Sequence, residues 1–305
     1  MAATRPIFPV AADVRAPYDP RVTEPLASRI RGDGVDLQLY EWPGEGRPIF
    51  LAHATGFHAR CWDQVVARLP GRHVYAIDMR GHGRSEKPEP PYPWGAFGRD
   101  VAAVAGEIGL RGAIGVGHSK GGFAVTMAAG LVPAAFASLL LVDPVIMERS
   151  AYESMGAPGE HFASRRRDRW ASPEEMFERF RERPPFALWK AEVLRDYCRY
   201  GLLAADDGDG YVLACPPRIE AAVYAGSAGA VEVYEAIETI DVPVTILRAR
   251  ERAEDGAMDM NTSPTAPKLA SHFRKATDVP LPHLSHFIPM EQPELVARYI
   301  MGMEG

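Results

Sequence analysis

The stretch A-I-G-V-G-H-S-K-G-G-F, residues 113–123, decides the fold. Its first residues are the small and branched apolar residues of a buried strand, and Lys120–Leu131 has the composition of a tightly packed helix. Ser119 lies where strand turns directly into helix, in the pattern G-x-S-x-G. So sharp a turn strains its central residue and leaves no room for side chains at Gly117 and Gly121. The pattern predicts a hydroxyl presented at a helix N-terminus, where negative charge is stabilised.

Strands and helices alternate around this turn. Before it, the sequence predicts buried strands at Ile49–His53 and Val74–Asp78 and helices at Cys61–Leu69 and Phe97–Ile108, and a further strand follows at Ser138–Asp143. Continuous apolar strands in β-α-β order indicate a parallel sheet covered by helices on both faces.

The same rhythm returns near the end of the chain. Strands are expected at Val242–Leu247 and Ala276–Val279, and helices at Pro267–Phe273 and Pro293–Met301. We therefore expect one interrupted α/β unit rather than two tandem domains.

The N-terminal part has a different character. Two alternating runs, at Arg21–Arg31 and Val35–Trp42, flank a Gly-Asp-Gly sequence and predict a β-hairpin. Residues 1–20 contain four prolines, which favour an extended arm.

Residues 147–230 interrupt the α/β pattern. They are polar and helical in pattern, rich in Phe, Trp and Tyr, and contain a capping box from Ser172 to Glu175. We interpret them as a helical cap whose apolar underside roofs a pocket. Residues 21–146 and 231–305 then form the α/β core.

Composition excludes several classes of protein. Of the 305 residues 47% are hydrophobic and 24% charged, which is typical of a globular chain. The net charge of −6 argues against a nucleic-acid surface, and we interpret the basic run at residues 165–169 as a solvated helix face rather than an anion site. No apolar stretch has signal-peptide or membrane-span length, so we expect a cytoplasmic protein without a membrane partner.

The chain resembles the α/β-hydrolase superfamily over about residues 21–305. Besides the serine turn, the likeness rests on H-A-T-G-F at 53–57, D-M-R-G-H-G-R-S at 78–85 and H-F-I-P-M-E-Q-P at 286–293. It implies an α/β fold with a mostly parallel twisted sheet, helices on both faces and a helical cap inserted after the strand that ends at Asp143. Because this fold hosts many reactions, the resemblance says less about substrate.

A serine hydroxyl needs a neighbouring base, and the resemblance places that base last in the chain. His286 precedes an apolar residue and a Pro-x-Glu-x-Pro-like stretch, as the family's histidine does, whereas His283 is expected in a surface loop. For the acid that orients the histidine we favour Asp143, which returns to the same carboxyl edge of the sheet as Ser119. Asp259 is the main alternative.

Other carboxylates near that alternative are Glu251 and Asp255, and Asp143 also fits a plain loop-capping role before a proline. By resemblance, the backbone N–H groups of Lys120 and of Thr55 or a neighbour form an oxyanion hole, although Ala54 replaces the family's usual glycine. The Lys120 side chain has two interpretations, attraction of an anionic substrate or a pair with a carboxylate, and we expect the pair.

A serine nucleophile favours acyl transfer and argues against epoxide or haloalkyl opening, which need a carboxylate in this fold. We therefore predict a serine hydrolase that cleaves an ester or lactone of an apolar or aromatic small molecule. The alternatives are another serine-triad reaction, such as C–C bond hydrolysis, perhydrolysis or a lyase reaction, and a ligand receptor with little turnover. No metal or organic cofactor is implied, and the three cysteines lack metal-ligand spacing.

Overall fold

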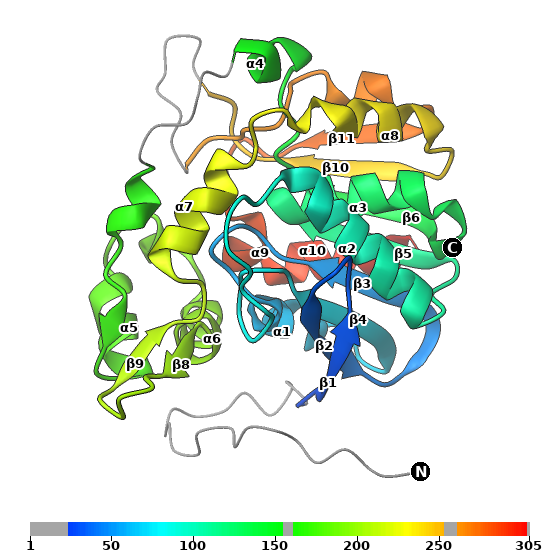
Figure 1. Cartoon of the computed structure of the whole chain (residues 1–305). Helices are drawn as coiled ribbons and strands as arrows, with labels where there is room; N and C mark the ends of the chain where they lie inside the picture. The colour runs from blue at the N-terminus through cyan, green and yellow to red at the C-terminus, as the bar shows by residue number, and fades with distance from the viewer. Residues whose placement is uncertain (1–23, 155–160, 253–260, 304–305) are drawn as a thin grey trace.

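One eight-stranded sheet organises the molecule (Figure 1). The computed structural model describes residues 24–154, 161–252 and 261–303. The strand order is β1-β2-β4-β3-β5-β6-β10-β11, and β2 runs antiparallel to β1 and β4 while the other neighbours pair in parallel. The strands are β1 Leu26–Arg31, β2 Asp36–Trp42, β3 Glu45–Ala52, β4 Arg72–Asp78, β5 Ala113–His118, β6 Phe136–Val142, β10 Val244–Arg248 and β11 Ala276–Pro280. The predicted α/β fold is confirmed.

Helices cover both faces of the sheet, and each face has its own apolar core. One core includes residues of α2, α3 and α8, such as Phe97, Phe123 and Ile237. The other includes Trp62 and Ile300, from the side of α1 and α10. The helices of the core are α1 Asp63–Val66, α2 Trp94–Glu107, α3 Lys120–Leu131, α8 Val233–Thr239, α9 Ile288–Glu291 and α10 Pro293–Gly302, with 3-10 turns at Ala59–Trp62, Pro133–Ala135 and Leu269–His272.

Most predicted elements occur, but two predicted helices are much shorter. The helix expected at residues 61–69 is a 3-10 turn followed by the single turn α1, and the one expected at 267–273 is a 3-10 turn only. Beyond Val66 the chain continues as turns, in which the Arg68 N–H donates to the Val65 carbonyl and the Leu69 N–H to the Val66 carbonyl. Helix α8 was not predicted. No helix of the described residues is both long and apolar enough to cross a membrane.

The inserted segment, residues 147–230, lies beside the sheet and is drawn in green and yellow in Figure 1. Its described helices are α4 Arg149–Ser154, α5 Pro173–Phe180, α6 Ala191–Tyr200 and α7 Pro217–Ala225, with 3-10 turns at Phe162–Arg165, Phe186–Leu188 and Ala230–Glu232. It also holds a small antiparallel sheet, β7 Arg169–Trp170, β9 Tyr211–Leu213 and β8 Leu202–Ala204, which was not predicted. Gly208 and Gly210, both at positive φ, form the tight turn between β8 and β9.

The inserted segment packs onto the loops at the carboxyl ends of the strands. A third apolar cluster joins its Trp170, Trp189 and Leu194 to Phe57, which follows β3, and Phe287, which follows β11. Within the segment the predicted capping box forms in one direction, and the return contact of Glu175 is made with the residue before Ser172. The Ser172 hydroxyl accepts the Glu175 N–H at 3.1 Å, and the Glu175 carboxylate accepts the Ala171 N–H at 2.8 Å. The arm expected at residues 1–20 lies outside the described residues.

Candidate active site

The turn between β5 and α3 holds Ser119 in the conformation that its glycines permit. Ser119 has φ 57° and ψ −122°, a region that residues with side chains rarely adopt. A Cβ on Gly121 would lie 2.1 Å from the Ala52 carbonyl oxygen, and one on Gly117 would lie 2.3 Å from the Gly121 oxygen. The backbones therefore approach too closely for any residue but glycine on either side of the serine.

A chain of two hydrogen bonds links Ser119, His286 and Asp143. The His286 Nε2 atom lies 2.9 Å from the Ser119 Oγ atom, and its Nδ1 atom lies 2.6 Å from Asp143 Oδ2. Since an ionised carboxylate only accepts, Nδ1 carries the proton and Nε2 is free to accept the serine proton. The three residues are 6%, 3% and 0% exposed, so little water competes for these bonds. An imidazole placed in this way can activate the hydroxyl as a nucleophile.

Asp143 lies in a second strained turn, directly after β6. Its φ is 44°, and its backbone N–H donates to the Leu247 carbonyl at 2.7 Å. The oxygen that does not face His286, Oδ1, accepts the Ala249 N–H at 2.9 Å and the Ser263 hydroxyl at 2.5 Å. These donors stabilise the charged carboxylate and fix its orientation.

Sequence reasoning missed Ser263, because no local motif ties it to a carboxylate far along the chain. Its neighbour Thr265 secures the same turn, donating its hydroxyl to the Pro144 carbonyl at 2.7 Å. Among the alternative acids, Glu251 pairs with Arg248. Asp255 and Asp259 lie outside the described residues.

His118, between Gly117 and the serine, supports the loop that carries His286. Because a carbonyl only accepts, its Nε2–H donates to the His286 carbonyl, at 2.8 Å. Burial, followed by the nearby His286 charge, lowers the pKa of His118 to about 3, so this imidazole stays neutral. His283 is exposed, in keeping with the surface position expected for it.

The loop after β3 brings Thr55 to the same edge of the sheet. His53, 1% exposed, anchors this loop, since its Nε2 accepts the Met79 N–H at 2.9 Å and its Nδ1–H donates to the Ala54 carbonyl at 2.7 Å. Lys120 is the first residue of α3, so its N–H has no acceptor within the helix. The oxyanion role of the Lys120 and Thr55 N–H groups stays a prediction.

The expectation for the Lys120 side chain is wrong. Lys120 is fully buried, and its Nζ atom has no hydrogen-bond or ion-pair partner in the described part of the chain. It lies 3.8 Å from the centre of the Phe97 ring instead, a cation–π contact. Burial lowers the pKa of this ammonium to about 7. The α2–α3 packing encloses the stem, so the head does not reach a carboxylate.

A cavity of about 350 Å³ lies between the loop after β3 and the inserted segment. Aromatic side chains dominate its wall, together with four arginines and one carboxylate: Phe57, Phe162, Trp170, Phe180, Phe186, Trp189, Tyr197, Tyr224, Phe287, Arg166, Arg167, Arg179, Arg183 and Glu220. Ser119 and His286 are not on this wall. Thr55 and Phe287 are, and Phe287 directly follows His286. The wall thus includes the residue next to His286 in the chain but not the imidazole itself.

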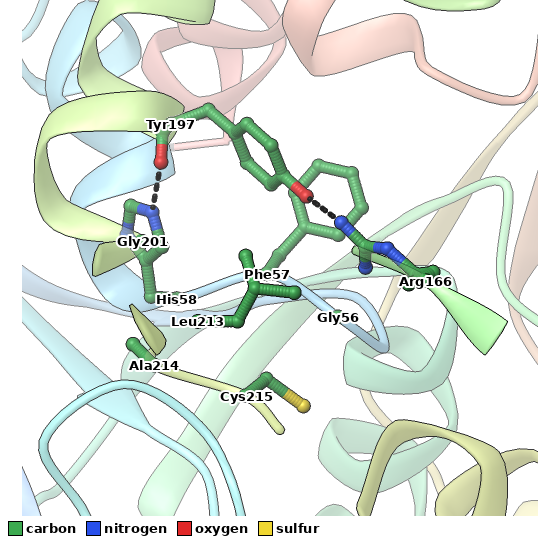
Figure 2. A pocket seen from close by; sticks show the side chains of 9 residues that line it. All are labelled: Gly56, Phe57, His58, Arg166, Tyr197, Gly201, Leu213, Ala214 and Cys215. Carbon is green, nitrogen blue, oxygen red and sulfur yellow. Dashed lines mark hydrogen bonds between the residues drawn. The ribbon is translucent and has the colours of Figure 1, made fainter. Parts of the chain in front are cut away.

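The basic run at residues 165–169 links a 3-10 turn to β7 and is not a helix face, but Arg165, Arg167 and Arg169 are exposed, as its composition suggested, whereas Arg166 is not. Arg166 is 21% exposed and forms an ion pair with Glu220, which is 5% exposed. Figure 2 shows how Tyr197 joins Arg166 to the core: its hydroxyl accepts from Arg166 at 2.9 Å, and its carbonyl lies 3.1 Å from His58 Nε2. A second void of about 10 Å³ beside them has room for about one water.

Comparison with known proteins assigns the chain to a family. Residues 49–299 match the alpha/beta hydrolase family, and the chain belongs to it. Similar curated proteins are a bifunctional esterase/perhydrolase of Acinetobacter calcoaceticus, 26% identical over 284 residues that cover 88% of this chain and 96% of that one, and a non-heme chloroperoxidase of Streptomyces lividans, 36% identical over 136 residues. The second alignment covers 43% of this chain and only about half, 49%, of the chloroperoxidase.

Solved structures agree on the fold. The crystal structure of an E-2-(acetamidomethylene)succinate hydrolase superposes with a TM-score of 0.71 at 22% identity, over 91% of this chain and 98% of the other. An esterase/perhydrolase and a chloroperoxidase are thus among the proteins similar to this chain, while its membership of the alpha/beta hydrolase family rests on the family match.

Proposed function

We propose that this chain is a serine hydrolase that cleaves a carboxylic ester or lactone through an acyl-enzyme intermediate. The observation that carries the proposal is the continuous hydrogen-bonded chain from the Ser119 hydroxyl through His286 to the Asp143 carboxylate. In this proposal Ser119 is the nucleophile, His286 the general base and acid, and Asp143 the group that orients the imidazole.

The acylation half begins when Ser119 Oγ attacks the carbonyl carbon and its proton passes to His286 Nε2. The former carbonyl oxygen becomes negative, and the backbone N–H groups of Lys120 and Thr55 are proposed to stabilise it. As the tetrahedral intermediate collapses, His286 gives its proton to the leaving alcohol oxygen. Asp143 stabilises the imidazolium that forms between these steps, since its Oδ2 accepts from Nδ1.

Deacylation repeats the sequence with water. His286 takes a proton from the water, the resulting hydroxide attacks the acyl carbon, and Ser119 leaves after regaining a proton. In the proposed enzyme, the inserted segment acts as a lid over this reaction. Phe57 and Phe287 lie on the wall of the cavity, and we infer that the scissile group passes these two rings to reach the serine.

The test is covalent labelling with a fluorophosphonate. We expect wild-type protein to be labelled at Ser119 and the Ser119→Ala variant to remain unlabelled while keeping the wild-type thermal unfolding curve. A panel of 4-nitrophenyl esters separates an enzyme from a ligand receptor, since a receptor shows negligible turnover. Labelling that persists in Ser119→Ala would refute the assignment of the nucleophile.

Perhydrolysis is a second candidate, favoured by the likeness to a bifunctional esterase/perhydrolase over most of both chains. Here hydrogen peroxide takes the place of water: His286 removes its proton, the hydroperoxide attacks the acyl carbon, and a peracid leaves as Ser119 is reprotonated. Adding peroxide to a reaction with a short-chain ester should then yield peracid in wild-type protein and none in Ser119→Ala. Without peracid above the uncatalysed level, this candidate fails and simple hydrolysis stands.

A further inference from the structure

The cavity wall carries an excess of positive charge. Four of its residues are arginines, and Glu220 is the one carboxylate among the described lining residues. This excess stands out because the chain as a whole has a net charge of −6. Arginine keeps its charge at every physiological pH, so the excess is permanent.

Two of the four arginines are already neutralised. Arg166 forms its ion pair with Glu220, and Arg167 pairs with Glu175 at 2.7 Å while its guanidinium lies 4.2 Å from the centre of the Trp170 ring. Both are therefore fixed parts of the wall.

The other two, Arg179 and Arg183, have no such partner. Arg179 lies in the last turn of α5, and Arg183 lies four residues further on, in the turn that follows. Neither side chain makes a hydrogen bond or an ion pair within the part of the chain that the structure describes, and Arg179 has only a longer-range electrostatic interaction with Glu175. The wall thus presents two guanidinium groups whose donors are unused.

We propose that Arg179 and Arg183 form a subsite for a carboxylate on the substrate. This inference rests on the proposed hydrolase function and narrows its substrate class to esters or lactones of an acid that carries a second, free carboxylate. The aromatic side chains of the cavity then contact the carbon skeleton between the two groups. The predicted apolar or aromatic substrate is thereby refined to one with an anionic end.

Physical chemistry favours a carboxylate over a neutral polar group. A guanidinium donates two parallel N–H groups that match the two oxygens of a carboxylate, and such charge-assisted bonds are roughly twice as strong as neutral ones. Both arginines are exposed, so the aromatic walls shield this attraction from water only in part. Entry of a neutral substrate instead removes water from both arginines without replacing its hydrogen bonds, which is unfavourable.

A matched pair of substrates tests the proposal. The mono-4-nitrophenyl ester of glutaric acid carries a free carboxylate, and the corresponding ester of glutaric acid monoamide has nearly the same shape but no charge. We expect wild-type protein to prefer the charged ester by about tenfold or more in kcat/KM. The preference should shrink between about 10 mM and about 0.5 M salt, since screening weakens exposed charges.

The chain supplies its own control variant. Arg181 lies between the two arginines in sequence, is half exposed and pairs with Glu178 and Glu182, and it does not line the cavity. The double variant Arg179→Gln/Arg183→Gln should lose the preference for the charged ester and the dependence of that preference on salt. Arg181→Gln should keep both.

The outcomes separate this inference from the proposed function. Equal hydrolysis of both esters by wild-type protein overturns the carboxylate subsite and leaves the hydrolase standing. Failure to hydrolyse either ester, with no fluorophosphonate labelling, overturns the hydrolase. Calorimetric titration with glutarate then still decides the subsite: binding that the double variant loses supports it, and no binding to wild-type protein overturns it.

Discussion

Two turns at the carboxyl edge of the sheet each hold a strained residue of the candidate site, and different contacts stabilise them. The turn after β5 holds Ser119 and the turn after β6 holds Asp143, and these are the two non-glycine residues at positive φ within the described ranges. The first turn depends on close backbone contacts, within the turn and with Ala52 of β3, that only glycine allows. The second is stabilised from a distance, by the Ala249 N–H and the Ser263 hydroxyl.

The difference explains why the first turn can be predicted from the sequence and the second cannot. The glycines that the first turn requires lie close to the serine in sequence, so they produce the motif G-x-S-x-G. The second turn is stabilised by β10 and the segment after it, and no sequence motif marks these contacts, because Ser263 and Ala249 are ordinary residues in sequence. Strained residues of this kind persist only where the surrounding structure holds them in place, as it does for both turns.

Replacing the acid gives the largest expected effect. Asp143→Asn keeps the shape of the side chain but turns an acceptor into a group that can also donate, so His286 is held in the wrong tautomer. We expect kcat to fall by about 10⁴-fold, the typical loss for this substitution in a serine triad. Steady-state kinetics on a 4-nitrophenyl ester measures it.

The alternative acid supplies the comparison for that experiment. Asp259→Asn should leave kcat within a few-fold of the wild-type value. A larger loss in Asp259→Asn than in Asp143→Asn would contradict our assignment of the acid.

Much of the fold was predictable because apolar periodicity and strand–helix alternation are local properties. The parallel strands and helices α2, α3 and α10 follow from them within a few residues. Helix α8, the sheet β7-β9-β8 and the short α1 did not, because tertiary packing or a turn of Asp and Gly residues decides them. At the site, motifs located Ser119 and His286, whereas long-range contacts decide the surroundings of Lys120.

The G-x-S-x-G motif contains Lys120 but does not predict its surroundings, because α2 provides them. Burial lowers the pKa of its ammonium to about 7 from the ordinary 10.5, so the unfolded chain binds more protons between these two pH values. The contribution of Lys120 to the free energy of unfolding therefore rises with pH from about 7 to about 10.5 and is lowest below about pH 7.

Lys120→Met removes the group and should flatten that rise. At pH 7 we expect the variant to be more stable than wild-type protein by several kcal/mol at most, on the order of 4 kcal/mol from the pKa difference. Urea unfolding at pH 7 and pH 9.5 measures it, with the exposed Lys268→Met as the control. A wild-type stability that falls over this range in step with Lys120→Met would contradict the buried, unpaired ammonium.

Adding one methyl group at Gly121 tests directly whether the serine turn needs its close backbone contacts. In Gly121→Ala the new Cβ would lie 2.1 Å from the Ala52 carbonyl oxygen, so the turn and β3 must separate. We expect a loss of about 1–3 kcal/mol in the free energy of unfolding and slower fluorophosphonate labelling. Gly106→Ala in α2, where a Cβ meets nothing within 4 Å, should be neutral or stabilising. Equal behaviour of the two variants would show that the turn tolerates a side chain.

The hydrogen bonds that Asp143 accepts from residues far along the chain can be weakened by a smaller change. Ser263→Ala removes one donor from Oδ1; the Thr265 hydroxyl lies farther from Oδ1, at 3.4 Å, and is closer to the Pro144 carbonyl, at 2.7 Å. The Ala249 N–H remains, so the carboxylate keeps its charge and most of its orientation. We expect kcat/KM to fall by about tenfold, the value of one hydrogen bond to a charged group. Ser271→Ala, whose hydroxyl donates to the Lys268 carbonyl in an exposed turn, should leave kcat/KM unchanged. If Ser263→Ala behaves like this control, backbone contacts alone hold the acid in place, and the two turns differ less than their hydrogen bonds suggest.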